Sequence, residues 1–215
     1  MKKILYLECN SGISGDMAVG ALLDLGADRG VLEKALDSMG LEGYHLHFGR
    51  KETCGLDAFD FDVHLETEGH SHEHGHSHGD DHVHRNLYDV YGIIDRLDAG
   101  GHVRELAKKM FRIVAEAESK AHGLPIEQVH FHEVGAVDSS IKVLLVGFVG
   151  VAVCVDNLGI DEVAVSPLSE GHGHVRCQHG ILPVPVPATA NIVAACGLDI
   201  RFTDNEGEMV TPTGA

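Results

Sequence analysis

An unbroken run of 13 apolar residues, from Val143 to Val155, constrains the fold of this chain more than any other feature. A helix that crosses a bilayer needs about 18 or more apolar residues in succession, so this run is too short for a membrane span. It predicts instead an element buried in a protein core. Apolar residues make up 44% of the 215 residues, which is enough to surround such an element. We therefore expect a globular protein of one ordinary domain or two small ones, with no membrane partner.

The balance of charges excludes one class of partner. Lys and Arg number 16 against 33 Asp and Glu, which gives a formal net charge of −17 with neutral His. Such a chain repels the phosphates of nucleic acid and attracts cations. The five cysteines are scattered without a CxxC pair, and only a short apolar stretch follows Met1. We therefore expect a cytoplasmic protein without disulfides or a signal peptide.

Hydrophobic periodicity predicts an α/β fold in layers, with helices packed on a mixed sheet. Apolar and polar residues alternate over 44–48 and 59–65, which favours two half-buried antiparallel strands joined through 51–56. A helical period is clearest over 102–122. We further expect helices at 17–25, 31–39, 87–97 and 188–196, strands at 3–9, 162–165 and 198–202, an extended segment at 128–132 and a loop at 166–179.

Residues 67–86 separate an N-terminal α/β segment (1–66) from a second one (87–215) and differ from both in composition. Histidine stands at almost every second position there and apolar side chains are nearly absent, so we expect a flexible His-rich insertion. Neutral imidazole suits Ni, Cu, Zn and Co. The tract therefore predicts a site that collects transition metal, and a polar linker without metal is the alternative. The candidate ligands are His70, His72, His74, His76 and His78.

A second candidate metal site lies at the start of the second segment's motif, HFHEVGAVDS. His130 and His132 flank Phe131 in a segment expected to be extended, so their side chains share one face. Glu133 and Asp138 follow across a glycine turn, and two imidazoles with two carboxylates are enough for an open metal site. The alternative is a pair of surface histidines beside a helix N-terminus, where both carboxylates favour the helix dipole.

The Gly/His-rich stretch 171–179 is a third source of ligands. His172 and His174 are flanked by glycines, which let a backbone approach a ligand closely. A polar loop without a ligand explains the same composition, and the residues alone leave both readings open.

The segment CNSGISGD at 9–16 predicts a strand, a tight turn and the start of a helix. Such a junction presents backbone N–H groups to phosphate or carboxylate. Its candidate binding residues are Ser11, Gly12, Ser14, Gly15 and Asp16. The lysine of a P-loop and the spacing of a dinucleotide fingerprint are both missing. Asp16 would repel an anion unless it holds a metal, caps the helix or positions a hydroxyl.

Several motifs together resemble the LarC family, the nickel insertion proteins of nickel-pincer nucleotide biosynthesis. They are CNSGISGDM at 9–17, the His-rich insert, HFHEVGAVDS at 130–139, SPL at 166–168, HGILPVP at 179–185 and TPTGA at 211–215. The matches follow one another in order over nearly the whole chain.

The resemblance implies a nickel chelatase of the lyase class. Its substrate would be pyridinium-3,5-bisthiocarboxylic acid mononucleotide, its metal Ni(II), and its product the nickel-pincer cofactor of lactate racemase-type enzymes. In the family the reaction depends on CTP with Mn or Mg at a C-terminal region that would follow 211–215. This chain is then the metal-handling part, inactive without that region as its partner, and we expect a homo-oligomer. The turn at 11–16 is the candidate cradle for the substrate phosphate. A nickel store or metallochaperone without catalysis is the alternative function.

Overall fold

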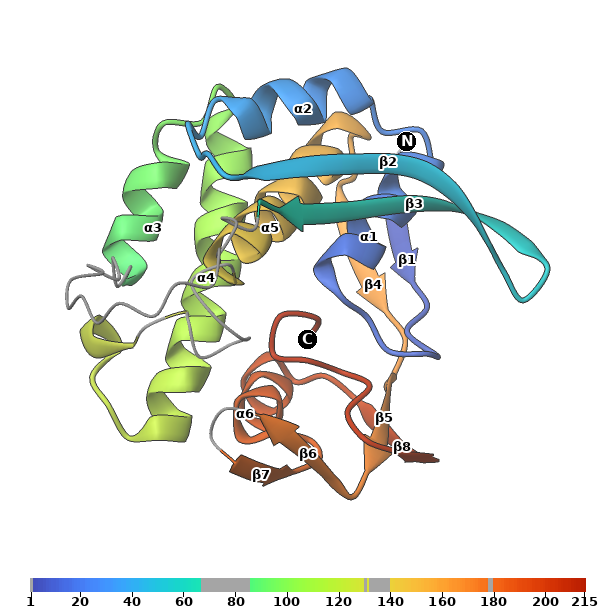
Figure 1. Ribbon diagram of the computed structural model, residues 1–215, viewed down its shortest axis with the longest axis vertical. Coiled ribbons are helices and arrows are strands. Elements are labelled where there is room, and N and C mark those ends of the chain that lie inside the picture. The colour runs from blue at the N-terminus through green and yellow to red at the C-terminus, as the bar shows by residue number, and fades with distance from the viewer. Residues whose placement is uncertain (1, 67–85, 130, 132–139, 178–179) are drawn as a thin grey trace, which may run out of the picture.

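The computed structural model describes residues 2–66, 86–129, 131, 140–177 and 180–215, and all structural statements below concern these residues (Figure 1). The predicted α/β class with mixed strand directions is confirmed. The described helices are α1 (Gly15–Asp24), α2 (Arg29–Asp37), α3 (Leu87–Ile94), α4 (Gly101–His122), α5 (Ser140–Asn157) and α6 (Pro187–Cys196), with a 3-10 turn η1 at Ile126–Gln128.

The helix ends follow local chemistry. The side chain of Asp28 accepts from the N–H of Val31 and so caps α2, and Asn86 forms a reciprocal capping box with Asp89 at the start of α3. Both satisfy N–H groups that have no acceptor inside the helix. At the C-terminus of α4, Gly123 takes a left-handed conformation with φ 66°, which ends the helix as the sequence predicts.

The strands pair into four two-stranded sheets. Two pairs are parallel, β1 with β4 and β5 with β8, and two are antiparallel hairpins, β2 with β3 and β6 with β7. Their bounds are β1 Ile4–Leu7, β2 Tyr44–Thr53, β3 Leu56–Leu65, β4 Glu162–Val165, β5 Leu168–His172, β6 His174–Cys177, β7 Gly180–Pro183 and β8 Ile200–Glu206.

Helix α5, which carries the 13-residue apolar run, lies in the middle of the core. Leu145, Val146 and Val149 are fully buried within it, in agreement with the prediction. Two of its glycines allow α1 to approach closely: a Cβ on Gly147 would lie 3.5 Å from the Cα of Gly15. The main core joins residues from both predicted segments, because α5 packs on α1 and α2. None of the described helices has both the length and the apolar character required to cross a bilayer.

Three sequence expectations are corrected. The predicted loop at 166–179 contains β5 and β6, because its Gly- and His-rich residues find main-chain partners in β8 and β7. The predicted connection at 51–56 is mostly strand, since the hairpin turns over Cys54 and Gly55 alone, both at positive φ. The segment 128–132, predicted to be extended, is extended only at Val129 among its described residues, because Gln128 ends η1 and Phe131 is in a 3-10 conformation.

Candidate functional site

The turn between β1 and α1 is held against the C-terminal segment 209–215. Gly12 has φ +82°, and a Cβ on it would lie 2.0 Å from the backbone oxygen of Met209. A Cβ on Gly214 would lie 1.9 Å from the backbone oxygen of Ile13. Ile13 also forms a parallel bridge with Val210. The two motifs, far apart in the chain, are therefore in backbone-to-backbone contact, which only glycine permits at these points.

The N-terminus of α1 lies open at this junction. Ser14 is the N-cap residue with extended backbone (φ −139°), but its side chain makes no capping hydrogen bond. Its hydroxyl donates instead to the carboxylate of Asp16. Asp16 therefore positions a hydroxyl, one of the three roles that the sequence allowed it. The first N–H groups of α1 have no acceptor within the helix, and they remain the group that would receive an anion.

A buried carboxylate anchors the segment 209–215. Glu170 on β5 is fully buried, and its Oε1 accepts from the N–H groups of Gly171 and Met209, each at 2.7 Å. Its other oxygen and Oε1 of Glu208 have no hydrogen-bond partner in the described structure. Burial, and secondarily the charge of Glu170, raise the pKa of the Glu208 carboxyl. Thr189 on α6 adds a bond from its hydroxyl to the backbone oxygen of Val210 at 3.2 Å.

A cavity of about 170 Å³ opens at the junction of these elements. Figure 1 shows the C-terminal segment in the middle of the molecule, between α6 and the region of α1 and β1. The cavity is lined mainly by apolar side chains of α4, α5 and α6, and polar groups come from the two motif segments. Its lining includes Ser14, Gly15, Met110, Phe148, Ile192 and Thr213. This arrangement suits a flat, largely apolar ring that carries an anionic group toward α1.

A chain of aromatic rings joins the cavity wall to the HFHE motif. Phe131, the central residue of the motif, is buried with 1% exposure. Its ring lies 5.5 Å from that of Phe111 on α4, in an edge-to-face arrangement. Phe111 lies in turn 4.8 Å from Phe148, which lines the cavity. The prediction that Phe131 packs inward is confirmed, and the two ring contacts connect this residue to the cavity wall.

The side chain of Arg201 lies beside the turn between β1 and α1. A guanidinium nitrogen of Arg201 on β8 donates to the hydroxyl of Ser169 at 3.0 Å and to the side-chain oxygen of Asn10 at 3.4 Å. In a chain of net charge −17, this contact puts a positive charge beside Asn10, in the turn that precedes α1.

The predicted metal ligands have different outcomes. His130, His132, Glu133, Asp138 and the tract histidines His70, His72, His74, His76 and His78 lie outside the described residues. His172 and His174 are described: both are exposed, and Gly173 turns the chain between them at φ +88°. Among described residues, no group of three His, Cys, Asp or Glu side chains is arranged to hold a metal ion. The ligand assignments therefore stay predictions.

Two of the thiols are unsuited to bind metal. Cys154 is buried in α5, which raises its pKa to about 12, and burial also raises the pKa of Cys9. Since the thiolate is the ligand form, both stay protonated at neutral pH. Cys54, Cys177 and Cys196 are exposed, and Cys196 lines the cavity.

Sequence reasoning missed several residues of this junction. Glu170, Arg201 and Phe148 contact distant parts of the chain, and no local sequence pattern predicts that they belong to this junction. Gly214 is different, because the motif TPTGA was already a point of resemblance. Its glycine was a signal that the backbone there approaches another segment.

The fold and the site define an α/β protein with a small ligand cavity at a strand–turn–helix junction, linked to a histidine-containing motif. A protein-family model described as "Nickel insertion protein" matches residues 5–215. The chain belongs to this family.

Curated relatives agree with the family match. A protein of Alkaliphilus metalliredigens named pyridinium-3,5-bisthiocarboxylic acid mononucleotide nickel insertion protein is 59% identical over 100% of this chain and 51% of its own length. A protein of the same name from Geobacillus kaustophilus is 43% identical over 99% of this chain and 49% of its own. A putative nickel insertion protein of Geobacter is 42% identical, again over about half of its length (50%). The chain therefore spans about half the length of the relatives it matches. No solved structure matches it.

Proposed function

We propose that this chain is the metal-handling part of a nickel insertase that acts on pyridinium-3,5-bisthiocarboxylic acid mononucleotide. The observation that carries the proposal is the cavity between the turn of α1 and the segment 209–215. Its apolar walls suit the pyridinium ring. The phosphate is assigned to the N–H groups at the start of α1, where Ser14 and Gly15 line the cavity. The names of the relatives supply the identity of the substrate.

Nickel is the second substrate and is assigned to His130 and His132, with Glu133 and Asp138 as further ligands. Mixed imidazole and carboxylate ligation holds nickel less tightly than a closed set of thiolates would, which suits an ion that must be handed over. The support from the structure is Phe131, whose ring ties this motif through Phe111 to the cavity wall. His172, His174 and the tract at 70–78 are assigned to collecting the ion before transfer.

The remaining steps are assigned to the part of the relatives that lies beyond the matched half. These are the dependence on CTP with Mn or Mg and the completion of the lyase-class reaction. We propose that this chain alone takes up both substrates but needs that region as its partner for turnover, within a cytoplasmic homo-oligomer.

Filling the cavity tests the proposal. Ala18 lines the cavity from α1, so Ala18→Leu should place three more carbon atoms in it while keeping a good helix former. Ala21→Leu, at an exposed position of the same helix, is the matched control. We expect Ala18→Leu to abolish binding of the mononucleotide in calorimetric titration and the control to bind as the parent does. Equal binding by both variants would show that the cavity is not the substrate site.

A second experiment separates an insertase from a nickel store. Deleting residues 69–84 should leave one nickel per chain that is transferred to the mononucleotide if His130 and His132 hold it, whereas a store would transfer none. Replacing both histidines with alanine, in the presence of the C-terminal region, should then stop cofactor formation and leave most nickel bound. Cofactor formation by the double variant would refute the assignment.

A further inference from the structure

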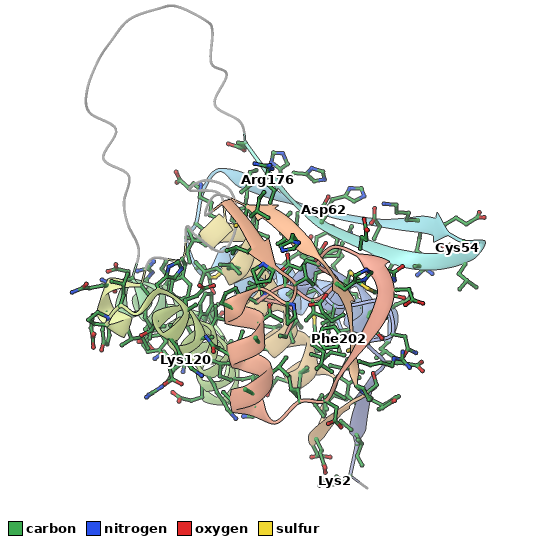
Figure 2. All side chains as sticks on the ribbon, turned by 90° about the horizontal axis from the view of Figure 1, so that it is seen from below. Lys2, Cys54, Asp62, Lys120, Arg176 and Phe202 are labelled. Atoms are coloured by element: carbon green, nitrogen blue, oxygen red, sulfur yellow. The ribbon has the colours of Figure 1, made fainter. Side chains whose placement is uncertain are left out.

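The β2–β3 hairpin brings three histidines together on its outer face. His45 pairs directly with His64 across the two strands, and His47 stands two residues further along β2, opposite Asp62. Figure 2 labels Cys54 at the free end of the hairpin and Asp62 between that end and the body of the molecule. The other face packs inward, where Phe61 is buried with 4% exposure. The alternation of the strands therefore gathers the imidazoles on the solvent side.

The distances between the ring centres are close to those expected for imidazoles that bind one ion. The ring centres of His45 and His64 are 6.3 Å apart, and those of His47 and His64 are 5.9 Å apart. With metal–nitrogen distances of about 2.0–2.1 Å, two imidazoles on one ion have their ring centres on the order of 5–6 Å apart. His64 is the shared member of both pairs. As placed, the three do not yet form a group arranged to hold metal, so binding requires the rings to rotate.

Rotating the three histidine rings toward a shared ion costs little free energy. The side chains of His45, His47 and His64 are 63%, 49% and 54% exposed, and no tight packing fixes their rotamers. Gly49 follows His47 on the same face, and a Cβ there would lie 2.8 Å from its Nε2. The ring of His47 therefore lies over this glycine, and no side chain at position 49 restrains it.

A carboxylate stands beside each ring. Glu66 lies 3.6 Å from Nδ1 of His45, Asp60 lies 3.7 Å from Nε2 of His47, and Asp62 lies 3.7 Å from Nε2 of His64. These separations exceed hydrogen-bond length, and exposed ion pairs of this kind stabilise a fold little. Carboxylates next to metal-binding imidazoles instead orient the rings and raise their basicity, and they add negative potential that attracts a cation.

We propose that His45, His47 and His64 form a transition-metal site on the outer face of the hairpin, which takes one divalent ion of the nickel, copper and zinc class. Imidazole nitrogen selects such ions over Mg and Ca, which prefer oxygen. The site goes beyond the proposed function, since its three histidines are neither in the cavity lining nor among the residues assigned to nickel above, and it requires no mononucleotide.

The test uses the full chain, without an affinity tag, in which the seven histidines between residues 70 and 84 are replaced by serine to lower background binding. Nickel chloride is titrated in equilibrium dialysis against this parent, His64→Gln, His45→Gln and a control, His102→Gln, which removes an exposed histidine of α4. We expect the first two variants to lose one nickel ion per chain, or to bind it about tenfold or more weakly. The control should match the parent. Equal isotherms for all four proteins would overturn the proposal.

Two further readouts locate the ion and its class. Copper(II), which broadens nearby NMR signals, should affect the amides of β2 and β3 in the parent before those of β6 and β7, which carry His174. Broadening confined to other elements would overturn the assignment. Magnesium chloride should displace no nickel, and competition by magnesium would refute the ligand chemistry. Melting curves without metal should be the same for all variants, because the replaced rings are exposed. The Ala18→Leu experiment tests the mononucleotide cavity and does not involve these histidines. The cavity and the hairpin metal site can therefore be refuted independently.

Discussion

Replacing Gly12 with alanine should loosen the junction that forms the cavity. The new Cβ would lie 2.0 Å from the backbone oxygen of Met209, whereas carbon and oxygen normally stay roughly 3.3 Å apart or more. Either the turn or the segment 209–215 must therefore move by about 1.3 Å. The segment is the part we expect to move, and a shift of that size breaks the 2.7 Å hydrogen bond from the N–H of Met209 to the buried carboxylate of Glu170.

The cost has two parts that can be separated. Holding alanine at φ +82° costs about 1–2 kcal/mol, and loss of a hydrogen bond to a charged, buried acceptor costs about 1.5–3 kcal/mol. Together they lower the free energy of unfolding by roughly 2.5–5 kcal/mol. Gly40→Ala and Gly26→Ala are matched controls, because their φ values of +65° and +104° bracket that of Gly12 and a Cβ on either meets nothing within 4 Å. The free energy of unfolding of the two controls should fall only by the cost of alanine at positive φ, about 1–2 kcal/mol.

Urea denaturation followed by far-UV circular dichroism measures all three variants on one scale. The effect of alanine on the unfolded chain is common to them, so it cancels in the comparison. Amide hydrogen exchange should also become faster at 209–215 in Gly12→Ala and stay unchanged there in the controls. If Gly12→Ala is no less stable than Gly26→Ala, the reasoning that the motifs are held in contact at this glycine is wrong.

Three other predictions follow from packing and charge. Phe111→Leu removes two aromatic ring pairs and should cost about 1–3 kcal/mol in urea denaturation; a loss below about 0.5 kcal/mol, typical of a surface change, would contradict it. Glu208→Gln should be more stable than the parent at pH 7, because the raised pKa of Glu208 makes its charged form unfavourable in the folded state. The difference should fade as pH falls below the carboxyl's ordinary value of 4.5, where both states bind the proton; a difference that does not change with pH would refute this. Nickel uptake in equilibrium dialysis should fall steeply below about pH 6, since imidazole must lose its proton to bind, and equal affinity at pH 5.5 and 7.5 would contradict histidine ligation.

Elements governed by local chemistry were predicted well from the sequence. The strand, turn and helix at 4–24 follow from a short apolar run and a Gly/Ser turn, and α4 ends at the predicted Gly123. The outer face of the hairpin was also within reach, because the predicted alternation already put the polar residues of both strands on one side. What the alternation could not supply was the register that places His45 opposite His64.

Elements that depend on distant partners were predicted poorly. The stretch 168–177 has a loop-like composition, yet it forms strands because β8 and β7 satisfy its main-chain groups. The burial of Glu170 also depends on residues that are distant in the sequence. A charged residue between glycine and serine is typical of a surface loop, but three N–H groups converge on its Oε1 and make its burial possible.

Two groups of glycines have different physical roles, and the contrast explains why the two motifs lie at the site. At Gly26, Gly40 and Gly123 the φ angle is positive and a Cβ would meet nothing, so these positions serve the turn alone. At Gly12 and Gly214 a Cβ would overlap a backbone oxygen of another segment. These two belong to the motifs CNSGISGDM and TPTGA, which lie near opposite ends of the given sequence and both contribute residues to the cavity lining. Their glycines therefore fix the shape of the cavity, while its chemistry comes from side chains such as Ser14 and Thr213. Substitutions at the two glycines should lower affinity for any ligand of the cavity, whatever its charge, whereas substitutions at the polar side chains should change which ligand is preferred.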